Sequence, residues 1–379
     1  MKPSYWELTS TYAPADLVVI GGGITGTSIA YYYKKAHPSE RVVILERGAL
    51  PSGATTRNAG FACFGSVSEL QADMEISSAD RVGEKVARRI RGLRRLREEL
   101  GDEAIGYEAC GGTEIFTDSK TFERSAKAVE GVNRLVERHI GFKNAFRVGE
   151  FEGYPAIFCA EEGAIHSGRM MQALHQKAMA LGVEYLPGMA VEGIEESREE
   201  NNAQKARVHV KLADATITAR RVAVATNGFA SKLLDIPVQP ARGQIIVSKP
   251  LEKMPWKGVY HYNEGYVYFR HVKGENGELR LLLGGARDVD PEGETTYEEG
   301  QNPQIREWLL NFAEEVLRIP LREEIDLEWS GFMGFTPEKE PLLKLLNPQT
   351  LVVTGLSGIG VSIGFEVAYE ALENAGWLR

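Results

Sequence analysis

A glycine-rich turn near the amino end constrains the fold of this chain more than any other segment. Gly21-Gly22-Gly23-Ile24-Thr25-Gly26 fits the pattern G-x-G-x-x-G. It follows an apolar stretch that we expect to be a strand (16–20), and a stretch of helical character runs from residue 25 to about residue 36. A second expected strand covers 41–45. This order is typical of a βαβ unit that binds a dinucleotide.

Each glycine of this turn has a mechanical role. Gly21 permits the tight turn out of the strand, Gly23 lets the backbone approach a pyrophosphate, and Gly26 lets the helix pack closely on the strand. The first helical residues, Ile24 and Thr25, present backbone N–H groups and a partial positive charge to the phosphates. The turn therefore predicts a phosphate site at the start of the helix.

An acidic residue closes the second expected strand. Glu46, with Arg47 after it, lies 20 residues beyond Gly26. A carboxylate at this point can accept hydrogen bonds from both ribose hydroxyls of an adenosine, and it would repel the 2′-phosphate of NADP. Because NAD and FAD are bound through the same pattern, the rest of the chain must decide between them.

The other expected elements divide the nucleotide-binding part into separate segments. Helices are expected at 71–100, 122–139, 167–181, 304–317 and 358–374. Strands are expected at 112–117, 183–186, 190–195, 207–212, 215–218, 221–225, 238–248, 258–270, 279–283 and 350–354, and residues 201–204 are expected to form a loop tip.

This order predicts an α/β fold with an α+β insertion. A Rossmann-like βαβ domain is built from discontinuous segments and joined to a substrate domain that contains a mixed antiparallel sheet. The predicted nucleotide-binding domain covers 13–105, 160–236 and 325–379, and the predicted substrate domain covers 106–159 and 237–324.

Charge and cysteine usage narrow the class of protein. The formal net charge is −9, which argues against a nucleic-acid or anionic-membrane partner, so the arginines at 88, 89, 91, 94 and 95 are interpreted as a solvated helix face. No apolar run is long enough for a membrane span, and residues 1–14 do not resemble a secretory signal.

The three cysteines lie far apart in the sequence, so they predict neither disulfides nor a zinc or other metal site. They favour a cytoplasmic location. Cys63 is expected to be a small buried side chain.

Further motifs follow the glycine turn in order along the chain. They are 52–60 (SGATTRNAG), 163–169 (GAIHSGR), 189–191 (MAV), 225–228 (ATNG), 240–244 (PARGQ), 329–331 (WSG), Thr336-Pro337 with Pro341, and 354–360 (TGLSGIG). Together they resemble the D-amino acid oxidase and glycine oxidase type of FAD-dependent oxidoreductases over nearly the full length. Residues 4–6 (SYW) and 266–270 (YVYFR) most resemble the glutamylputrescine oxidoreductase branch.

The resemblance implies FAD as the cofactor, bound noncovalently because no cysteine has the family's flavin-attachment context. Ser357 is expected to cap the last helix, whose N-terminus would favour negative charge on the reduced flavin. The residues at the family's cofactor-binding positions are Gly21, Gly23, Ile24, Thr25, Gly26, Glu46, Arg47, Ser52, Ala54, Thr55, Arg57, Asn58, Ala59, Gly60, Val191, Thr226, Asn227, Gly228, Gly331, Met333, Gly355, Ser357, Gly358, Ile359 and Gly360.

The implied reaction is oxidation of a small amine. Hydride passes from the carbon that bears the amine to flavin N5, and water hydrolyses the imine that results; no acid–base pair is nominated. Candidate residues of the substrate pocket are Tyr260, Tyr262, Tyr266 and Tyr268, or these tyrosines are ordinary aromatics of a half-buried sheet. Tyr266, Tyr268 and Arg270 alternate along one expected strand and so share a face.

The chain departs from the family at two positions. Met333 stands where relatives that act on free amino acids have a carboxylate-binding arginine, so the simplest inference is a substrate without an α-carboxylate; Arg287 and Arg270 are the possible substitutes. Residues 281–283 are all leucine and lack the lysine that assists oxygen activation in sarcosine oxidase relatives. The electron acceptor is therefore either O2 or another redox partner.

Two other functions remain open at this point. One is oxidation of a secondary amine on a larger substrate such as modified tRNA, which the acidic chain disfavours. The other is a flavin-binding protein without amine turnover, serving as a redox sensor or assembly factor. Turnover of a panel of amines with an artificial acceptor separates the main prediction from the last alternative.

Overall fold

The computed structural model describes residues 2–379 apart from 198–206, 253, 255 and 275. The expected loop tip at 201–204 lies outside the described residues. The chain forms two compact units, each made from discontinuous segments. Unit 1 contains Met1–Thr56, Gly168–Ala241 and Phe332–Arg379, and unit 2 contains Arg57–Ser167 and Arg242–Gly331.

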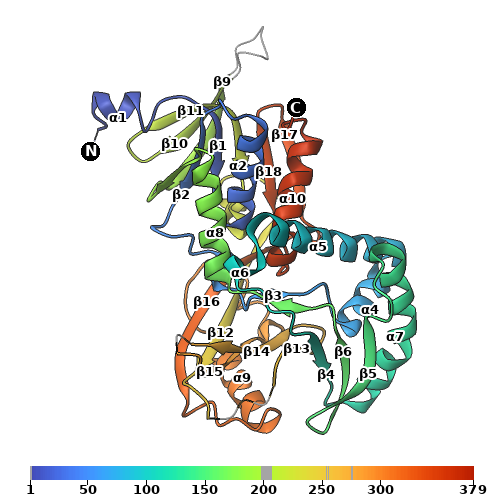
Figure 1. The fold of residues 1–379 in the computed structure, drawn as a ribbon. Coiled ribbons are helices and arrows are strands. Elements are labelled where there is room, and N and C mark those ends of the chain that lie inside the picture. The colour runs from blue at the N-terminus through green and yellow to red at the C-terminus, as the bar shows by residue number, and fades with distance from the viewer. Residues whose placement is uncertain (1, 198–206, 253, 255, 275) are drawn as a thin grey trace. The chain divides into compact units, whose positions relative to one another are not determined.

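Unit 1 is built on a largely parallel sheet (Figure 1). Its strands, in spatial order, are β17 (Leu342–Asn347), β18 (Thr350–Thr354), β11 (Thr216–Val224), β1 (Ala15–Ile20), β2 (Val42–Glu46) and β8 (Glu184–Pro187). β17 pairs antiparallel with β18, whereas the other neighbours in this order pair in parallel. β2 and β18 are buried along their whole length and β1 is buried except at Asp16, which fits apolar runs without alternation.

One strand of this sheet differs from the sequence prediction. The expected strands 215–218 and 221–225 form a single strand, β11. Its first part pairs antiparallel with β10 (Arg207–Leu212), which in turn pairs with β9 (Val191–Ser197), and its second part pairs in parallel with β1. The polar residues Arg220 and Arg221 interrupt the apolar pattern without interrupting the strand, because hydrogen bonding continues on both sides of them.

The helices α1 (Tyr5–Thr9), α2 (Ile24–Ala36) and α10 (Gly360–Asn374) lie within unit 1, and α8 (Ser167–Ala180) lies within it from Gly168 on. α2 and α10 lie side by side (Figure 1), and a Cβ on Gly364 of α10 would lie 3.0 Å from Ile24 Cγ2. The prediction that Ser357 caps the last helix is wrong. α10 has Ile359 at its N-cap, and the Ser357 hydroxyl donates instead to the carbonyl of Gly355 at 3.2 Å.

Unit 2 is built on an eight-stranded mixed sheet. Its strands, in spatial order, are β16 (Ile325–Phe335), β12 (Gln239–Ser248), β15 (Leu279–Gly285), β14 (Val267–Lys273), β13 (Val259–Tyr262), β4 (Gly112–Ile115), β6 (Tyr154–Cys159) and β5 (Phe146–Phe151). β13 pairs in parallel with β4 and antiparallel with β14. β5, β6, β16 and β17 have no counterpart among the expected strands.

The expected single strand 258–270 is a hairpin. β13 and β14 are joined by a turn in which Asn263, Glu264 and Gly265 have φ of 52°, 55° and 78°. Three successive left-handed residues cannot continue a strand, so the chain reverses there.

The smaller elements of unit 2 complete its layers. They are α3 (Ala54–Arg57, which begins in unit 1), α4 (Val67–Ile76), α5 (Ala79–Leu100), α6 (Asp102–Ile105), α7 (Ser119–Ile140), α9 (Pro303–Glu315) and the strand pair β3 (Phe61–Ala62) with β7 (Gly163–Ala164). α9 and one face of the sheet share a core that includes Tyr260, Phe269 and Phe312. The expected helix 71–100 is broken at Ser77 and Ser78, because the Ser78 hydroxyl caps α5 by accepting from Arg81 N.

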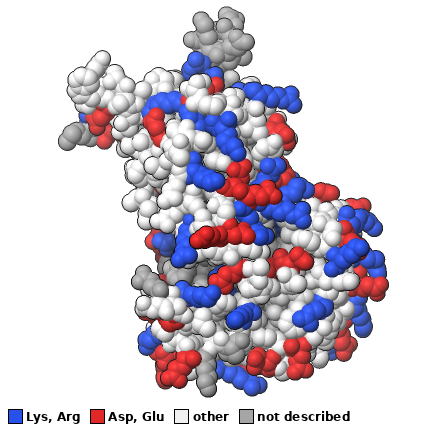
Figure 2. Space-filling model, viewed as in Figure 1, with Lys and Arg blue, Asp and Glu red and all other residues white. Residues whose placement is uncertain are grey.

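The arginines of α5 are not all solvated as expected. Arg89 is buried, and its guanidinium donates to the carbonyl of Phe64 at 2.7 Å and to Glu69 at 2.9 Å. Elsewhere acidic and basic side chains are interspersed over most of the face shown in Figure 2.

The two units divide the chain at other points than the predicted domains do. Residues 57–105 and 160–167 fall in unit 2, whereas the prediction placed them with the nucleotide-binding segments. Which segments bind cofactor and which bind substrate remains a prediction. Across the described residues, no helix combines the length and the apolar character needed to cross a membrane.

Candidate cofactor and active-site residues

The glycine turn of unit 1 has the close backbone contacts that its sequence predicts. Gly21 has a φ of 103°, and a Cβ on Gly26 would lie 2.0 Å from the carbonyl oxygen of Gly21. α2 begins at Ile24 with Gly23 at the N-cap, and Gly23 provides no side chain to cap it. Thr55 Oγ1 accepts from Ile24 N at 3.1 Å. Only glycine fits at Gly21 and Gly26. The Ile24 N–H, which was expected to face a phosphate, already donates to Thr55, so the phosphate site at the start of α2 stays a prediction.

Two hydroxyl groups beside this turn show that it suits a polar ligand. Thr25 Oγ1 and Thr226 Oγ1 are buried and have no hydrogen-bond partner among the described residues. Thr226 adjoins the turn, since a Cβ on Gly21 would lie 3.3 Å from its methyl group. Leaving a buried hydroxyl unpaired costs about 1–3 kcal/mol. A bound group with several acceptor oxygens, such as a pyrophosphate, would satisfy both hydroxyls, so these residues fit the phosphates of FAD.

Glu46 lies buried at the end of β2, where it also orders the turn. Its Oε2 accepts from Gly22 N at 2.9 Å, and its Oε1 accepts from Gly48 N at 3.0 Å. Each carboxylate oxygen retains a second acceptor position for a ribose hydroxyl. Arg47, next in the chain, lies with its guanidinium 3.8 Å from the centroid of the Phe229 ring.

His175, which no sequence pattern indicated, contacts the backbone of the glycine turn. His175 Nε2 lies 3.1 Å from the carbonyl oxygen of Gly22. Burial lowers the pKa of His175, although the Gly22 carbonyl and the charge of Glu46 oppose this shift. The imidazole is therefore neutral at pH 7, and it donates from Nε2 to the carbonyl. Its position on α8 gave no sequence signal, because nothing in the local pattern links it to residue 22.

Two further turns of unit 1 meet at the carboxyl ends of neighbouring strands. Asn227, after β11, accepts through Oδ1 from Gly355 N at 3.2 Å and from Leu356 N at 3.3 Å, after β18. Thr354 Oγ1 donates to the carbonyl of Asn227 at 2.7 Å. Both turns use left-handed residues, with φ of 48° at Asn227 and 49° at Ser357. The sequence predicted both turns, but not the side chain that joins them.

Met333 lies against both of these turns. Its carbonyl oxygen would be 2.3 Å from a Cβ on Gly228, and its sulfur would be 3.7 Å from a Cβ on Gly358. A thioether cannot donate a hydrogen bond or supply positive charge. The position expected for a carboxylate-binding arginine therefore offers an apolar side chain.

Residues 57–60 of the motif at 52–60 lie in unit 2, where other predicted motifs hold them. Arg57 Nη1 donates to the carbonyl of Ser330 at 2.9 Å, and Trp329 Nε1 donates to the carbonyl of Arg57 at 3.0 Å. A Cβ on Gly331 would lie 2.8 Å from Arg57 Cβ, so glycine is required beside it. Asn58 Oδ1 accepts from Gly60 N at 2.7 Å. The motif at 329–331 thus positions the loop that carries Arg57.

Arg270 is buried beneath the same loop. Its Nη1 donates to the carbonyls of Gly60 at 2.8 Å and Ile165 at 3.1 Å, and its Nε donates to the carbonyl of His271 at 3.1 Å. Burial lowers the pKa of Arg270 below its usual range. These contacts favour a structural role for Arg270 over a carboxylate clamp.

The candidate tyrosines lie on opposite faces of the unit 2 sheet. Tyr260 stacks on Phe269 with ring centroids 4.8 Å apart, and Tyr262 lies 4.9 Å from Phe312, so both face α9. Tyr268 belongs to the other face, and its ring centroid lies 5.8 Å from that of Phe61.

Tyr268 and Arg287 are electrostatically coupled. Burial raises the pKa of Tyr268 to about 12, and the positive charge of Arg287 opposes this shift. Tyr266 lies in the turn before β14, where its carbonyl accepts from Ala286 N at 2.7 Å. Tyr268 and Arg287 are therefore the pocket candidates that the structure brings into electrostatic range.

Val191 and Ser52 are two further positions at which the resemblance implies a contact with the cofactor. Val191 begins β9 two residues after Met189, whose N–H donates to the carbonyl of Glu46 at 2.8 Å. Ser52 precedes α3 and is half-buried. Neither arrangement tests the contact with FAD that the resemblance implies, so both stay predictions.

Comparison with solved structures identifies the fold. Iminodiacetate oxidase from Chelativorans has a similar structure, with a TM-score of 0.71, 19% identity and coverage of 93% of each chain. Glycine oxidase from Bacillus cereus is also similar, with a TM-score of 0.68, 20% identity and coverage of 96% of this chain and 95% of that one. At these identities the likeness shows the mixed α/β fold alone, and it confirms the predicted fold class.

The sequence then identifies the family. The family model described as FAD dependent oxidoreductase (DAO) matches residues 16–373, so the chain belongs to this family and is an FAD-dependent oxidoreductase. Sarcosine oxidase subunit beta from Arthrobacter is 24% identical over 382 residues, covering 93% of this chain and 87% of that protein. The probable oxidoreductase OrdL from Rhizobium meliloti is 25% identical over 365 residues, covering 92% and 80%. The predicted family and cofactor are confirmed.

Proposed function

We propose that this oxidoreductase uses noncovalent FAD to oxidise a small amine whose reacting carbon carries no carboxylate. The observation that carries the proposal is the place of Met333, whose sulfur lies against the closing glycine turn where a clamp arginine is expected. Relatives named for sarcosine, glycine and iminodiacetate oxidation support the amine class. Those substrates carry carboxylates, so the proposal places this chain apart from them.

The residues of unit 1 have distinct roles in this proposal. Gly23 and the hydroxyls of Thr25 and Thr226 hold the phosphates, and Glu46 holds the ribose. Bound FAD would accept a hydride at N5 from the carbon that bears the amine, leaving an imine that water hydrolyses. Met333 keeps the closing turn free of side-chain charge, which favours a neutral amine over an ionised amino acid.

A second candidate substrate has an acidic group far from its amine. Arg287 supports it, because the residue is partly buried and its positive charge acts on Tyr268. The buried Arg270 is the weaker anchor, since its guanidinium already donates to backbone carbonyls.

The composition of β15 bears on which electron acceptor reoxidises the flavin. Its residues Leu281, Leu282 and Leu283 are buried and offer no cation. We therefore propose slow reaction with O2 and transfer of electrons to another redox partner. Comparing reoxidation by O2 with reoxidation by an artificial acceptor tests this point.

The substrate is tested by anaerobic bleaching of the flavin. Polyamine-type or N-substituted amines should reduce the flavin at least about 1,000-fold faster than glycine or simple D- and L-amino acids, because an unpaired buried carboxylate costs several kcal/mol. Met333→Arg should raise the rate with glycine, and Met333→Leu, which adds no charge, should not.

Two outcomes would contradict this function. Efficient reduction by a free amino acid that is lost in Arg287→Ala would show that the carboxylate clamp has moved to Arg287. Flavin that no amine in the panel bleaches would favour a flavin-binding protein without amine turnover.

A further inference from the structure

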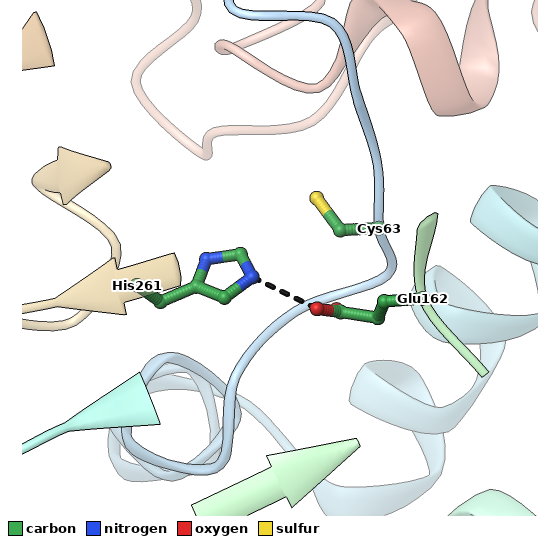
Figure 3. A group of neighbouring side chains, drawn as sticks. All are labelled: Cys63, Glu162 and His261. Carbon is green, nitrogen blue, oxygen red and sulfur yellow. Dashed lines mark hydrogen bonds and ion pairs between the residues drawn. The ribbon is translucent and has the colours of Figure 1, made fainter. Parts of the chain in front are cut away.

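A cysteine, a glutamate and a histidine from three separate segments of unit 2 meet in its interior. Cys63 follows β3, Glu162 precedes β7 and His261 lies in β13. One ligand atom from each, Sγ, a carboxylate oxygen and an imidazole nitrogen, lies within 4.8 Å of the other two. Figure 3 shows the three side chains around a common space, with His261 Nε2 at 2.8 Å from Glu162 Oε2. We refer to these residues as the Cys–Glu–His cluster.

The cluster lies in a region rich in buried negative charge. Glu162 is 1% exposed and Glu114 is 3% exposed, and within the described residues neither forms an ion pair with lysine or arginine. Glu69 does have such a partner, Arg89. Glu114 accepts hydrogen bonds from Ser66 and Ser68, whereas among the described residues the one ionisable group that forms a hydrogen bond with Glu162 is the imidazole of His261. A metal cation beside Glu162 would therefore offset part of the cost of burying its carboxylate.

The backbone leaves room for the carboxylate of Glu162. A Cβ on Gly112, in β4, would lie 1.9 Å from Glu162 Oε2. Glycine at this position lets the carboxylate lie against the strand and face His261. Its Oε1 accepts from Phe64 N at 3.3 Å, a long hydrogen bond that compensates little of its desolvation.

We propose that Cys63, Glu162 and His261 bind one zinc ion. A thiolate, an imidazole and a carboxylate are the three ligand types of zinc, whereas magnesium and calcium favour oxygen ligands alone. Tetrahedral zinc holds its ligand atoms about 3.5 Å apart, so the three atoms need to shift by about 1 Å or less. On binding, the Cys63 thiol loses its proton to solvent. His261 also releases to solvent the Nε2 proton that it donates to Glu162 and carries a proton on Nδ1, so that Nε2 coordinates the zinc in place of that hydrogen bond.

The metal would act as a structural tie within unit 2. Cys63 comes three residues after Gly60, whose carbonyl accepts from Arg270. A zinc ion would join this segment to β13 through His261 and to the turn before β7 through Glu162. The zinc proposal does not depend on which amine the enzyme oxidises, because none of its tests needs turnover.

The test uses the flavin-containing protein after removal of metal with a chelator and dialysis. One equivalent of Zn²⁺ is added, and bound zinc is counted by mass spectrometry. In parallel, Co²⁺ is added and a difference spectrum is recorded, because thiolate coordination gives a charge-transfer band that imidazole or carboxylate ligands alone do not give. The expected results are about one zinc per chain and this band in the wild type.

Matched cysteine variants locate the site. Cys63→Ser should weaken zinc binding by at least about 100-fold and remove the cobalt band, because losing a ligand exceeds the 10–100-fold effect of losing a group behind one. Cys110→Ser is the control, because Cys110 lies outside the cluster, and it should bind like the wild type. His261→Gln should also lose zinc, with flavin content and circular dichroism reporting its folding.

Three outcomes would overturn the proposal. The first is wild-type protein that binds less than about one tenth of an equivalent of zinc at a free concentration of about 1 µM, where a structural site should be full. The second is stoichiometric binding that Cys63→Ser leaves unchanged, which would place the metal elsewhere. The third is cobalt binding without a charge-transfer band in the wild type, a result that does not depend on any variant's folding.

Discussion

Gly23 is the residue at which a single substitution should have the largest effect on cofactor binding. Gly23→Val should abolish FAD binding, because a branched side chain would occupy the space that the pyrophosphate needs. Even a Cβ here would lie 2.9 Å from Thr55 Oγ1. Gly131→Val in α7 is the control, since Gly131 is exposed and a Cβ there meets nothing within 4 Å. Flavin absorbance per chain after purification is the measurement, and a folded Gly23→Val protein with a full complement of FAD would refute this role.

Single residues could be predicted from the sequence where a local pattern demanded them. The glycines at 21 and 26 are an example, because the turn has no room for a side chain. Ser357 was wrongly expected to cap a helix, since the chain needs two more residues before α10 can start. The Cys–Glu–His cluster was not foreseen, because cysteine spacing carries no information about partners from distant segments.

At the scale of elements, Asn227 joins the turns that follow β11 and β18. Asn227→Ala should lower the free energy of unfolding by about 1–3 kcal/mol, because it removes two hydrogen bonds and puts alanine at a φ of 48°. Asn227→Gly should lower it less, because glycine accepts this backbone conformation. Denaturant unfolding of both variants measures the difference. Equal losses would show that the backbone conformation contributes nothing.

A second prediction at this scale concerns pH and the contact between α2 and β11. Glu40 accepts from Tyr33 on α2 and from Arg220 on β11. Burial opposes ionisation, but these two hydrogen bonds lower the pKa of Glu40 below its ordinary value of 4.5. Its contribution to stability is therefore fully present above pH 4.5 and is lost as the pH falls through the native pKa.

Glu40→Gln should accordingly lower the melting temperature by about 1–4 °C at pH 7, a modest effect because Arg220 is partly exposed. The difference from the wild type should shrink as the pH is lowered below 4.5. Melting curves at several pH values check this, with the exposed Glu338→Gln as control. If the difference in melting temperature between the wild type and Glu40→Gln grows on acidification, the predicted direction of the pH dependence is wrong.

Elements with a strong period or composition were predicted well, and elements whose limits depend on partners were not. The first βαβ unit has its predicted order because strand, turn and helix each carry a local signal. β11 was divided in two because its arginines resemble a break, whereas hydrogen bonds on both edges keep it continuous. The hairpin at 263–265 was missed because Asn, Glu and Gly adopt left-handed conformations that no apolar pattern reveals.

At the scale of the whole molecule, the way FAD is held can be tested directly. Acid precipitation should leave the flavin in the supernatant, because none of the three cysteines lies in a flavin-attachment context. The released flavin should chromatograph as FAD, and adding it back at about 100 times its dissociation constant should stabilise the protein by about 2.7 kcal/mol. Flavin that remains in the precipitate would show a covalent link.

The overall architecture was predictable because the apolar patterns of strands and helices are local and recur along the chain. The boundaries between the two units could not be predicted in this way. The largely parallel sheet of unit 1 and the mixed sheet of unit 2 both follow from strand and helix order. The assignment of 57–105 to a unit depends on long-range packing of α4 and α5, which no local pattern encodes.

The continuity of β11 has a consequence for folding. Its Val222 pairs with Val18 of β1 and with Thr350 of β18. The sheet of unit 1 therefore joins segments that are synthesised far apart in time. During synthesis the first βαβ unit leaves the ribosome before β11 and β18 exist, so one edge of β1 has no strand to pair with at that stage. Such non-local pairing makes folding slow, and we expect it to create a window in which chaperones act on the emerging chain.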